Sequence, residues 1–450
     1  MSEGFVINML LKKISFYFFG GSARNISGIL KNFLWIILCL NLLWINKSYS
    51  QGSPNPLFVD PETQDFSQNP KLLERILASP HGYFRFINKQ FSRIICHKFE
   101  EMYAGSPSFN LHGDAHLEQY AVTDLGRGLT DFDDSSAGPA ILDIMRFGVS
   151  LNLACKMNHW NDSFSGLFGI FLEGYRGALE NPSLEAPEPA LVSKLRSNFT
   201  YNKEVYYKWV DSIMDKIPAS ELDSLMVSMK TYVDAMMKEN PQLSQHYFDV
   251  INLGYLRMGI GSALDLKYLA RCQGESDDPF DDVVLEIKEV RDISQIPCLT
   301  RVQIFDPFRI LIGQARIAYQ PFYHLGYFYF KEKNFWVHSW VMNYKELDIQ
   351  KNYRDKKELQ EIVYDVGVQL GRGHPKQIAA PLDFQLRQSQ LRWLEQYDNK
   401  LLKACESLAE EVEYSWKRFS EKVMTEERAN KSIQDQTGIS GENQRNKLVK

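Results

Sequence analysis

Several features that mark common classes of protein are missing from this sequence. No run of five basic residues occurs among the 450 residues, and the net charge is −5. Nucleic-acid-binding domains carry a basic patch or stripe, so no nucleic-acid partner is expected. No internal repeat is visible, which argues against a solenoid. Hydrophobic residues make up 44% of the chain, enough to bury a large core in two or three subdomains.

Cysteine is sparse, and its spacing excludes two kinds of site. None of the six cysteines forms a Cys-x-x-Cys pair, so the sequence predicts neither a zinc site nor a dense disulfide framework. The first is Cys39, and the other five are Cys96, Cys155, Cys272, Cys298 and Cys405. An odd number of cysteines in an exported chain leaves at least one free thiol, and we expect most of the five to be buried structural residues.

The N-terminal apolar run, residues 33–45, is too short for a transmembrane helix, which needs about 20 residues. Lys31 and other basic residues precede it, and Ser-Tyr-Ser at residues 48–50, a small-x-small pattern, follows it. This is the pattern of a signal peptide. We predict a signal peptide over residues 1–50, a mature chain that begins near Gln51, and a periplasmic or secreted protein. An uncleaved membrane anchor is the alternative, and membrane contact is expected only through this segment.

The sequence does contain a pair of acidic segments in a fixed order. His-Gly-Asp-Ala-His at residues 112–116 is followed by Gly-Leu-Thr-Asp-Phe-Asp-Asp at residues 128–134. Kinase-like phosphotransferases use one carboxylate to orient the attacking hydroxyl and another to hold the magnesium that bridges the phosphates. We therefore predict Asp114 as the catalytic carboxylate and Asp131 as the main magnesium ligand. Asp133 or its neighbour Asp134 would reach a second ion.

The two histidines that flank Asp114 allow another interpretation. His112, Asp114 and His116 could be ligands of a hydrolytic metal centre. Such a centre needs further ligands at suitable spacing, and the other seven histidines stand alone. We therefore expect no zinc, and we expect both histidines to support the loop by hydrogen bonds and packing.

Lys288 and a short glycine-rich segment are the candidates for phosphate binding. Lys288 follows the apolar run Val-Val-Leu-Glu-Ile, where an unpaired ammonium group is costly. We predict that it pairs with phosphate or with a carboxylate such as Asp306. Gly259, Gly261 and Ser262 would let backbone amides approach phosphates, with a simple chain bend as the alternative.

Hydrophobic periodicity and turn residues divide the chain into six parts. We expect a signal peptide or anchor (1–50), a linker (51–70), a helical lobe with the catalytic-type loop (71–248), a β-rich small lobe (249–350), closing helices (351–425) and a disordered tail (426–450). The helices that we expect are two in 71–103, broken at Ser79-Pro80, one at 140–156, two or three in 164–247, and one each at 357–374 and 383–425. The strands that we expect are short ones at 109–111 and 129–132, a hairpin formed by 250–270 and 283–290, and a hairpin over 322–340.

The motifs taken in order resemble a known family. These motifs are Ser-Pro-His-Gly-Tyr-Phe-Arg at 79–85, the two acidic segments, Leu-Asp-Ile-Met-Arg-Phe at 142–147, Gly-Ile-Gly-Ser at 259–262 and Leu-Glu-Ile-Lys-Glu at 285–289. In this order they resemble the bacterial domain of unknown function 2252 family. That family is related to aminoglycoside and choline kinases. The resemblance runs from about Ser79 to about Lys376 and implies a protein-kinase-like fold.

The resemblance also implies roles for three further residues. Asp143 and Arg146 would brace the catalytic loop from behind, with a plain surface ion pair as the alternative. The family usually carries a metal-binding asparagine five residues after Asp114, where this chain has Gln119. A further departure is that no third glycine follows Ser262.

In ordinary kinases the glycine-rich hairpin and its lysine precede the catalytic loop, whereas Asp114 precedes Lys288 here. We therefore expect an α+β, protein-kinase-like two-lobed fold in circularly permuted order, in which Lys288, Asp114 and Asp131 converge in one cleft. The expected function is an exported phosphotransferase that moves a phosphate from ATP, with Mg²⁺, to a hydroxyl of an unidentified small molecule or protein. A catalytically degenerate kinase-like binding protein is the second hypothesis, and a metal-dependent hydrolase is the third.

Overall fold

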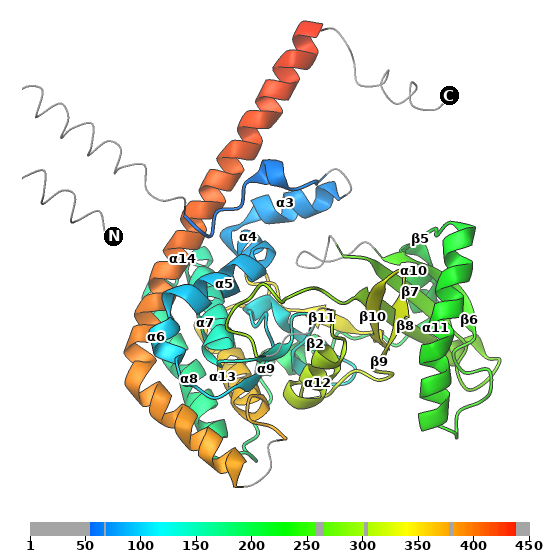
Figure 1. The fold of residues 1–450 in the computed structure, drawn as a ribbon, viewed down its shortest axis with the longest axis horizontal. Coiled ribbons are helices and arrows are strands. Elements are labelled where there is room, and N and C mark those ends of the chain that lie inside the picture. Colours follow the sequence, from blue (N-terminus) through cyan, green and yellow to red (C-terminus); the bar gives the residue numbers. More distant parts are fainter. Residues whose placement is uncertain (1–54, 67–68, 257–264, 301–304, 378–380, 438–450) are drawn as a thin grey trace, which may run out of the picture. The chain divides into compact units, whose positions relative to one another are not determined.

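Helices and antiparallel sheets make up the part of the chain that the computed structural model describes (Figure 1). This part comprises residues 55–66, 69–256, 265–300, 305–377 and 381–437. From Pro56 onward the chain forms one compact unit. The predicted signal peptide and the glycine-rich segment with Gly259, Gly261 and Ser262 lie outside the described residues. Of the helices described, none combines the length and the apolar character needed to cross a membrane.

The first helices begin where the sequence supplies N-caps. The Asn69 side chain accepts a hydrogen bond from Leu72 N, and the Ser79 side chain accepts one from Gly82 N. In each case a proline occupies the first helical position, where its missing N–H costs nothing. The predicted break at Ser79-Pro80 is confirmed. The short helices of this region are η1 (Pro61–Thr63), α3 (Pro70–Ala78), α4 (Pro80–Phe86), α5 (Asn88–Lys98) and α6 (Glu100–Tyr103).

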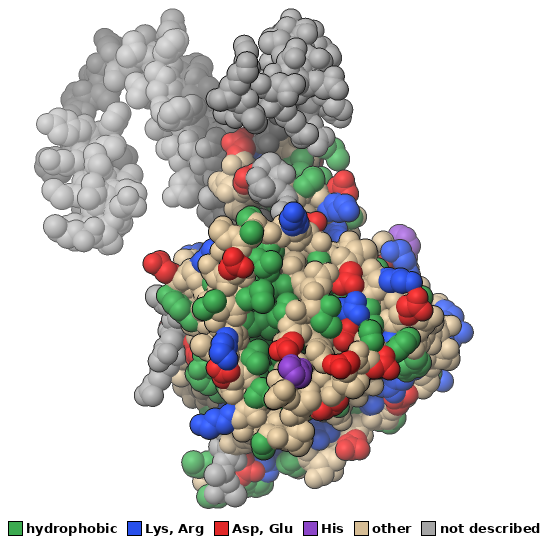
Figure 2. All heavy atoms as spheres, turned by 90° about the vertical axis from the view of Figure 1, so that its right-hand side faces the viewer, with side chains coloured by type: hydrophobic (Ala, Val, Ile, Leu, Met, Phe, Trp, Pro, Cys, Tyr) green, Lys and Arg blue, Asp and Glu red, His purple; other side chains and the backbone are tan. Residues whose placement is uncertain are grey.

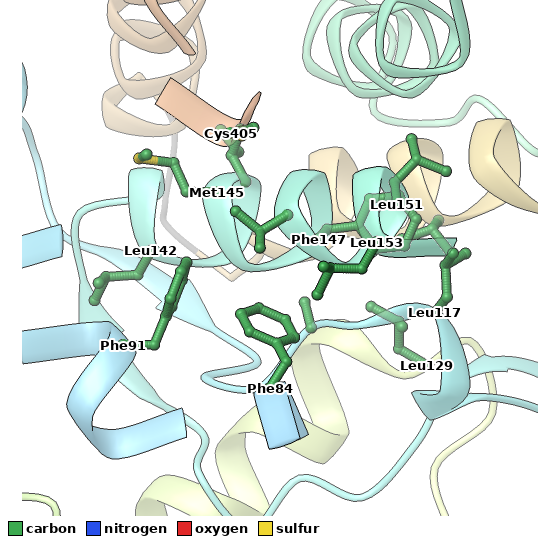
Figure 3. Close-up of a cluster of buried hydrophobic side chains, with 14 of the residues drawn as sticks. Phe84, Phe91, Leu117, Leu129, Leu142, Met145, Phe147, Leu151, Leu153 and Cys405 are labelled. Carbon is green, nitrogen blue, oxygen red and sulfur yellow. The ribbon is translucent and has the colours of Figure 1, made fainter. Parts of the chain in front are cut away.

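The helix α7 (Ile141–Met157) is the centre of the helical region, and 15 of its 17 residues are buried. A helix that is apolar all round has neighbours on every side. Figure 3 shows Phe84 and Phe91 on one side of α7 and Cys405 of α14 (Leu382–Thr437) on the other. A Cβ at Gly148 would lie 2.6 Å from the Cys405 sulfur, so only glycine lets α14 approach this closely.

Most of the remaining helices complete the helical region, and α11 packs on the large sheet. Helices α8 and α13 pack closely, since a Cβ at Gly367 would lie 2.2 Å from the carbonyl oxygen of Phe171. The helices are α8 (Phe164–Glu180), α9 (Ala190–Arg196), α10 (Lys203–Ser212), α11 (Ala219–Glu239), α12 (Phe308–Ile317) and α13 (Lys356–Gly373), with 3-10 turns η2 (Leu117–Gln119), η3 (Asn161–Ser163) and η4 (Pro279–Asp281).

A six-stranded antiparallel sheet has the order β5-β6-β7-β8-β10-β9. Its strands are β5 (Met214–Asp215), β6 (Val250–Leu256), β7 (Lys267–Cys272), β8 (Val283–Glu289), β9 (Gly326–Phe330) and β10 (Lys333–Ser339). Lys331 and Glu332, with φ of 49° and 61°, make the tight turn between β9 and β10. One face of the sheet packs its apolar residues against α11. The other presents Lys267 and Lys288, which lie opposite each other.

Two small sheets hold the segments around the predicted catalytic loop. They are formed by β1 (Phe109–Leu111) with β4 (Ser136–Gly138), and by β11 (Tyr344–Glu346), β2 (Tyr120–Thr123) and β3 (Arg127–Leu129). Because β11 follows β10 closely in sequence and pairs with β2, it connects the large sheet to the catalytic-loop region.

Several expected boundaries were wrong. Residues 71–103 form four helices and residues 164–247 form four, because the chain turns at Ile87 and Phe99 and at Pro-rich breaks that periodicity alone does not locate. The expected strand at 129–132 ends at Leu129, and the expected single arm 250–270 holds two strands. The presumed linker packs on the body: Leu57 is fully buried and its carbonyl accepts from Tyr83 Oη. Helix α14 continues to Thr437, beyond the expected end at Thr425, through residues of good helix propensity.

One disulfide joins parts that are 202 residues apart in sequence. Cys96 of α5 is bonded to Cys298, in the segment that follows β8. A crosslink of this kind typically stabilises the fold by about 2–4 kcal/mol. Among the described residues Cys155, Cys272 and Cys405 are free and buried, as most of the five were expected to be.

The surface on the side of the large sheet carries charges of both signs. Figure 2 shows Lys and Arg side chains interspersed with Asp and Glu on this face, and hydrophobic side chains gathered near its middle. Exposed hydrophobic residues on this side of the fold include Met226 and Val227 of α11 and Ile251 of β6.

Candidate functional site

The two acidic segments touch through their backbones. Gly113 has a φ of +83°, and a Cβ there would lie 1.9 Å from the carbonyl oxygen of Asp134. Only glycine satisfies both the left-handed conformation and this approach. Asn88 Nδ2 of α5 donates to the Gly113 carbonyl oxygen at 3.0 Å and to Asp134 Oδ2 at 3.1 Å. The Gly-Asp step of the first motif is therefore fixed against the end of the second.

The Asp143 carboxylate, at the start of α7, binds the backbone of the first acidic segment. Its two carboxylate oxygens accept hydrogen bonds from His112 N at 2.7 Å and Gly113 N at 2.9 Å. His374 Nε2 lies 3.1 Å from the same carboxylate. Burial raises the pKa of Asp143, but the hydrogen bond and charge of His374 outweigh it and lower the pKa below its usual value. This fully buried carboxylate fixes the backbone immediately before Asp114.

Arg146 fixes the Asp114 side chain itself. Its Nε and Nη2 lie 2.8 and 2.7 Å from Asp114 Oδ1, its Nη1 donates to the Phe84 carbonyl oxygen, and its guanidinium lies 3.7 Å from the centre of the Phe84 ring. Burial raises the pKa of Asp114 to about 7 even though Arg146 acts to lower it. Asp143 and Arg146 thus each contact the loop and are buried, so the alternative of a surface ion pair was wrong.

The flanking histidines are buried parts of the loop. His112 Nδ1 accepts from Asp114 N at 3.3 Å, so its Nε2–H donates to the Thr130 carbonyl oxygen at 2.9 Å. His116 Nε2 lies 3.7 Å from Asp114 Oδ2, and its ring is edge-on to that of His81. Within the described ranges no group of three or more His, Cys, Asp or Glu side chains is arranged to hold a metal ion. Since both His112 nitrogens are engaged by backbone groups, this geometry does not support the hydrolytic metal centre.

The second segment is held by Lys288, which reaches it from the large sheet. Lys288 Nζ lies 2.7 Å from Asp131 Oδ1 and 2.7 Å from Asp133 Oδ2. The Trp336 indole N–H donates to Asp133 Oδ1 at 2.9 Å. Asp131 has a φ of 58°, an uncommon conformation for a residue with a side chain and one that recurs at functional sites.

The charges of this cluster are mutually dependent. Burial lowers the pKa of Lys288, but Asp131 and Asp133 outweigh it and hold the pKa well above the usual value. Burial raises the pKa of Asp131, and the charges of Lys288 and Lys267 bring it well below its usual value. Burial and the charge of Asp131 raise the pKa of Asp133 to about 6. At neutral pH one ammonium group is therefore shared by two carboxylates.

One sequence prediction about this cluster was wrong, and the second-ion role of Asp133 or Asp134 stays a prediction. Asp306 is not the partner of Lys288, because its side chain accepts from Phe308 N at the start of α12. The two acids expected to reach a second ion are both engaged by protein groups. Asp133 is held by Lys288 and Trp336, and Asp134 accepts from Arg291 at 2.8 Å and from Asn88. Sequence spacing gave no signal for these partners, since they come from distant segments.

Gln119 lies between the carboxylates of Asp114 and Asp131. Its Nε2 is 3.5 Å from Asp114 Oδ2 and 3.5 Å from Asp131 Oδ2. Its backbone carbonyl accepts from Thr130 N and Thr130 Oγ1, which fixes it against the second segment. The side chain is buried and borders the same cavity as both aspartates.

Asp114, Gln119, Asp131 and Lys288 all line one cavity of about 740 Å³. Lys288 thus converges with the two aspartates, as predicted from the sequence. Other charged and aromatic residues that line the cavity were not predicted: Arg85, Glu118, Lys267, Glu286, Arg291, Trp336, His338 and Glu346. For Lys267 a signal was available, since it begins an apolar run, Tyr-Leu-Ala, much as Lys288 follows one.

The donor set fits a magnesium ion that keeps most of its ligands from substrate and water. Mg²⁺ is commonly bound through one or two protein carboxylates together with phosphate oxygens. The Asp131 side chain is about one-third exposed and lines the cavity, so Asp131 is the residue that would hold such an ion. Gln119 turns its Nε2 toward Asp131, and as oriented here its amide does not present an oxygen to a metal.

The sequence profile of a family described as "Uncharacterized protein conserved in bacteria (DUF2252)" matches residues 69–216 and 199–422, two overlapping stretches that cover most of the chain. No curated protein matches, and no solved structure matches.

Proposed function

The chain belongs to the bacterial DUF2252 family, and on that premise we propose that it is a kinase-like phosphotransferase that moves a phosphate from ATP to a hydroxyl acceptor. The observation that carries the proposal is the meeting of Asp114, Asp131 and Lys288 in one cavity, although Lys288 lies more than 150 residues beyond the others. Base, metal ligand and phosphate-binding lysine are the groups that phosphoryl transfer requires.

In this proposal Asp114 orients the acceptor hydroxyl and takes its proton. Arg146 engages Oδ1 of Asp114, which leaves Oδ2 on the side of Gln119 and the cavity. Asp131 would hold a magnesium ion, and the chemistry that this ion would supply is neutralisation of charge on the donor phosphates. Lys288 keeps Asp131 and Asp133 in position and adds positive charge at the phosphate end of the cavity.

The proposal includes the permuted kinase-like arrangement of two lobes. The helical region contributes Asp114 and Asp131, the six-stranded sheet contributes Lys288, and the chain passes from β10 to β11 along the cavity through Trp340 and Val341. A cavity between two such parts is a usual place for a ligand.

Transfer of labelled phosphate from ATP is the direct test. We expect transfer to small hydroxylated acceptors or to protein, dependent on Mg²⁺ and absent in Asp131→Asn. A screen of nucleosides, sugars, amino alcohols and proteins supplies the acceptor. Nucleotide binding without transfer to any acceptor or to water would instead support the non-catalytic binding protein. The contacts of the Gln119 amide with both carboxylates favour that alternative, because they present a donor where a metal needs an oxygen.

We predict that transfer rises with pH through about 7. Burial raises the pKa of Asp114 to about 7, so the base form is the minor one below that pH and the major one above it. The value of kcat/KM should therefore fall about tenfold per pH unit below pH 6 and level off above pH 8. Nucleotide affinity measured over the same range separates this effect from titration of Asp133. A profile that is flat from pH 5 to pH 8 would contradict the role of Asp114.

We further propose that the protein acts outside the cytoplasm. The Cys96–Cys298 disulfide supports this, because such bonds persist mainly in oxidising compartments, and the N-terminal segment has the pattern of a signal peptide. In fractionated cells we expect a mature N-terminus near Gln51 and two cysteines that alkylate only after reduction. A soluble cytoplasmic chain that retains Met1 and has all its thiols reduced would refute the proposal.

A further inference from the structure

A chain of buried polar groups leads from the first acidic segment into the helical region. Tyr175 of α8, His374, which directly follows α13, and Asp143 of α7 are all fully buried. Tyr175 Oη lies 2.7 Å from His374 Nδ1, and His374 Nε2 lies 3.1 Å from Asp143 Oδ2. The Asp143 carboxylate accepts from the two backbone N–H groups directly before Asp114. Groups from three helical segments are thereby joined to the backbone that carries Asp114.

The hydrogen-bonding roles in this chain follow from its Asp143 end. An ionised carboxylate only accepts hydrogen bonds, so Nε2 of His374 carries a proton and donates to Asp143. The other ring nitrogen, Nδ1, is occupied by the Tyr175 hydroxyl. Turning the ring over would place carbon atoms at both positions and break both contacts. The His374 side chain therefore has one orientation in which its hydrogen bonds are made, and Tyr175 selects it.

The backbone of His374 holds the strand that leads into the same segment. Its carbonyl oxygen accepts from Asn110 N at 3.0 Å and from Asn110 Nδ2 at 2.9 Å. Asn110 lies on β1, two residues before His112. His374 thus acts on the first acidic segment in two ways, directly through its carbonyl at β1 and indirectly through Asp143.

Stability does not explain why polar groups occupy this part of the core. Replacement of a buried ion pair by apolar residues of similar volume is often neutral or stabilising. A buried polar network in which every group has a partner instead rigidifies the structure and specifies one geometry. The geometry specified here is that of the backbone beside Asp114, the proposed base. A misplacement of a catalytic group by about 1 Å can lower a rate by about 10²-fold.

We propose that His374 is a positioning residue for phosphate transfer and that Tyr175 fixes the orientation of its ring. His374 acts through Asp143, which lies 231 residues before it in sequence, and has no contact with the substrate. This inference rests on the proposed function and adds to its machinery a residue that does not line the cavity.

The first test is His374→Phe in the full-length chain, which keeps a ring and removes both nitrogens. Transfer of labelled phosphate from ATP with Mg²⁺ is measured to the acceptor found in the screen and to water. We expect kcat to fall by about 10–100-fold, because the backbone beside Asp114 loses its fixed geometry. The affinity for ATP should stay largely intact, because Asp131 and Lys288 lie at the donor end and His374 contacts neither.

Two milder variants separate positioning from packing. The amide of a glutamine can place an N–H near the position of Nε2, so His374→Gln should recover most of the lost kcat. Tyr175→Phe removes only the hydroxyl at Nδ1 and should give an intermediate loss. The matched control is Tyr247→Phe. The Tyr247 hydroxyl also lies beside a histidine nitrogen, His324 Nε2 at 3.3 Å, but neither residue lines the cavity, so kcat should be unchanged.

Nitrogen-15 NMR of the histidine side chains gives a readout that does not depend on transfer. We expect the His374 Nε2–H signal to be protected from exchange with solvent, because the group is fully buried and hydrogen-bonded. Its absence in His374→Phe assigns the signal. Tyr175→Phe should shift the signal, since the hydroxyl at the other nitrogen is gone, and Tyr247→Phe should leave it in place.

The outcomes distinguish the inference from the proposed function. Full kcat in folded His374→Phe would overturn the inference while the proposed function stands. Equal losses of kcat and ATP affinity in His374→Phe, with no recovery in His374→Gln, would assign His374 a purely structural role and overturn it too. An Nε2–H signal that exchanges freely would show that the contact with Asp143 is not made. A wild-type protein that has the protected signal but transfers no phosphate to any acceptor or to water overturns the proposed function, and the role in transfer with it.

Discussion

Asp114→Asn is expected to lower the rate of phosphate transfer by about 10²–10⁴-fold, the usual contribution of a positioned general base, and to leave Mg²⁺-dependent nucleotide affinity largely intact. Asp114 acts on the acceptor hydroxyl and does not hold the donor. Asp131→Asn should instead abolish nucleotide binding itself, because it removes the carboxylate of the proposed metal site. Radiolabelled transfer and nucleotide titration, performed on both variants, distinguish the two roles.

The loss of stability in Asp114→Asn needs its own control. Arg146 is buried and has Asp114 as its carboxylate partner, so the asparagine leaves a guanidinium without a counter-charge. Breaking such a buried pair costs about 3–5 kcal/mol. The double variant Asp114→Asn, Arg146→Met removes both charges and should recover part of that stability while transfer stays absent. Transfer that returns with stability would show that Asp114 has only a structural role. A loss of nucleotide binding in Asp114→Asn as severe as in Asp131→Asn, with the fold intact, would contradict the division of roles.

Lys288→Met is expected to be among the most destabilising single changes in the cavity, by about 3–5 kcal/mol. The substitution leaves Asp131 and Asp133 close together without the ammonium group that now lies 2.7 Å from each. It also removes positive charge from the phosphate end, so nucleotide affinity should fall with stability. Chemical denaturation and nucleotide titration measure the two effects separately.

A double-mutant cycle assigns this cost to the ion pairs. Lys288→Met combined with Asp133→Asn should be more stable than Lys288→Met alone, because one of the two uncompensated carboxylates is gone. Trp336 can still donate to the amide oxygen of the new asparagine, so the indole contact is conserved. If the changes in unfolding free energy of the two substitutions simply add, Lys288 and Asp133 do not interact in solution. That result would contradict the proposal that Lys288 holds the second acidic segment in place.

Short-range sequence features predicted the local structure of the site well. The strand at Phe109–Leu111, the helix that begins at Ile141 and the hairpin over β9 and β10 are present near the predicted positions. Each is encoded by residues within about one turn or one hairpin of each other, through alternation, helical periodicity and turn residues.

For distant segments, the sequence predicted which residues would meet in one site, but it did not predict their individual contacts. The sequence placed Lys288 with Asp114 and Asp131 because their chemistry belongs together, but it proposed Asp306 as a carboxylate partner. The Asp306 side chain instead accepts a hydrogen bond from Phe308 N, at the start of α12. Asp133 and Asp134 looked like metal ligands because crowded carboxylates need a cation, and the cations present are the Lys288 ammonium and the Arg291 guanidinium. Local sequence shows that charge must be balanced and does not show which distant residue balances it.

By itself the sequence determined the approximate positions of several elements, the order of the acidic motifs and the need for a cation beside them. These features depend on local pattern and on the cost of unpaired charge. Tertiary structure alone decided three things: that one lysine is shared by two aspartates, that a second lysine lies opposite it across the sheet, and that Cys96 is bonded to Cys298. The physical reason is that ion pairing, strand register and disulfide formation depend on distances of a few ångströms between segments, which chain folding sets and sequence separation does not reveal.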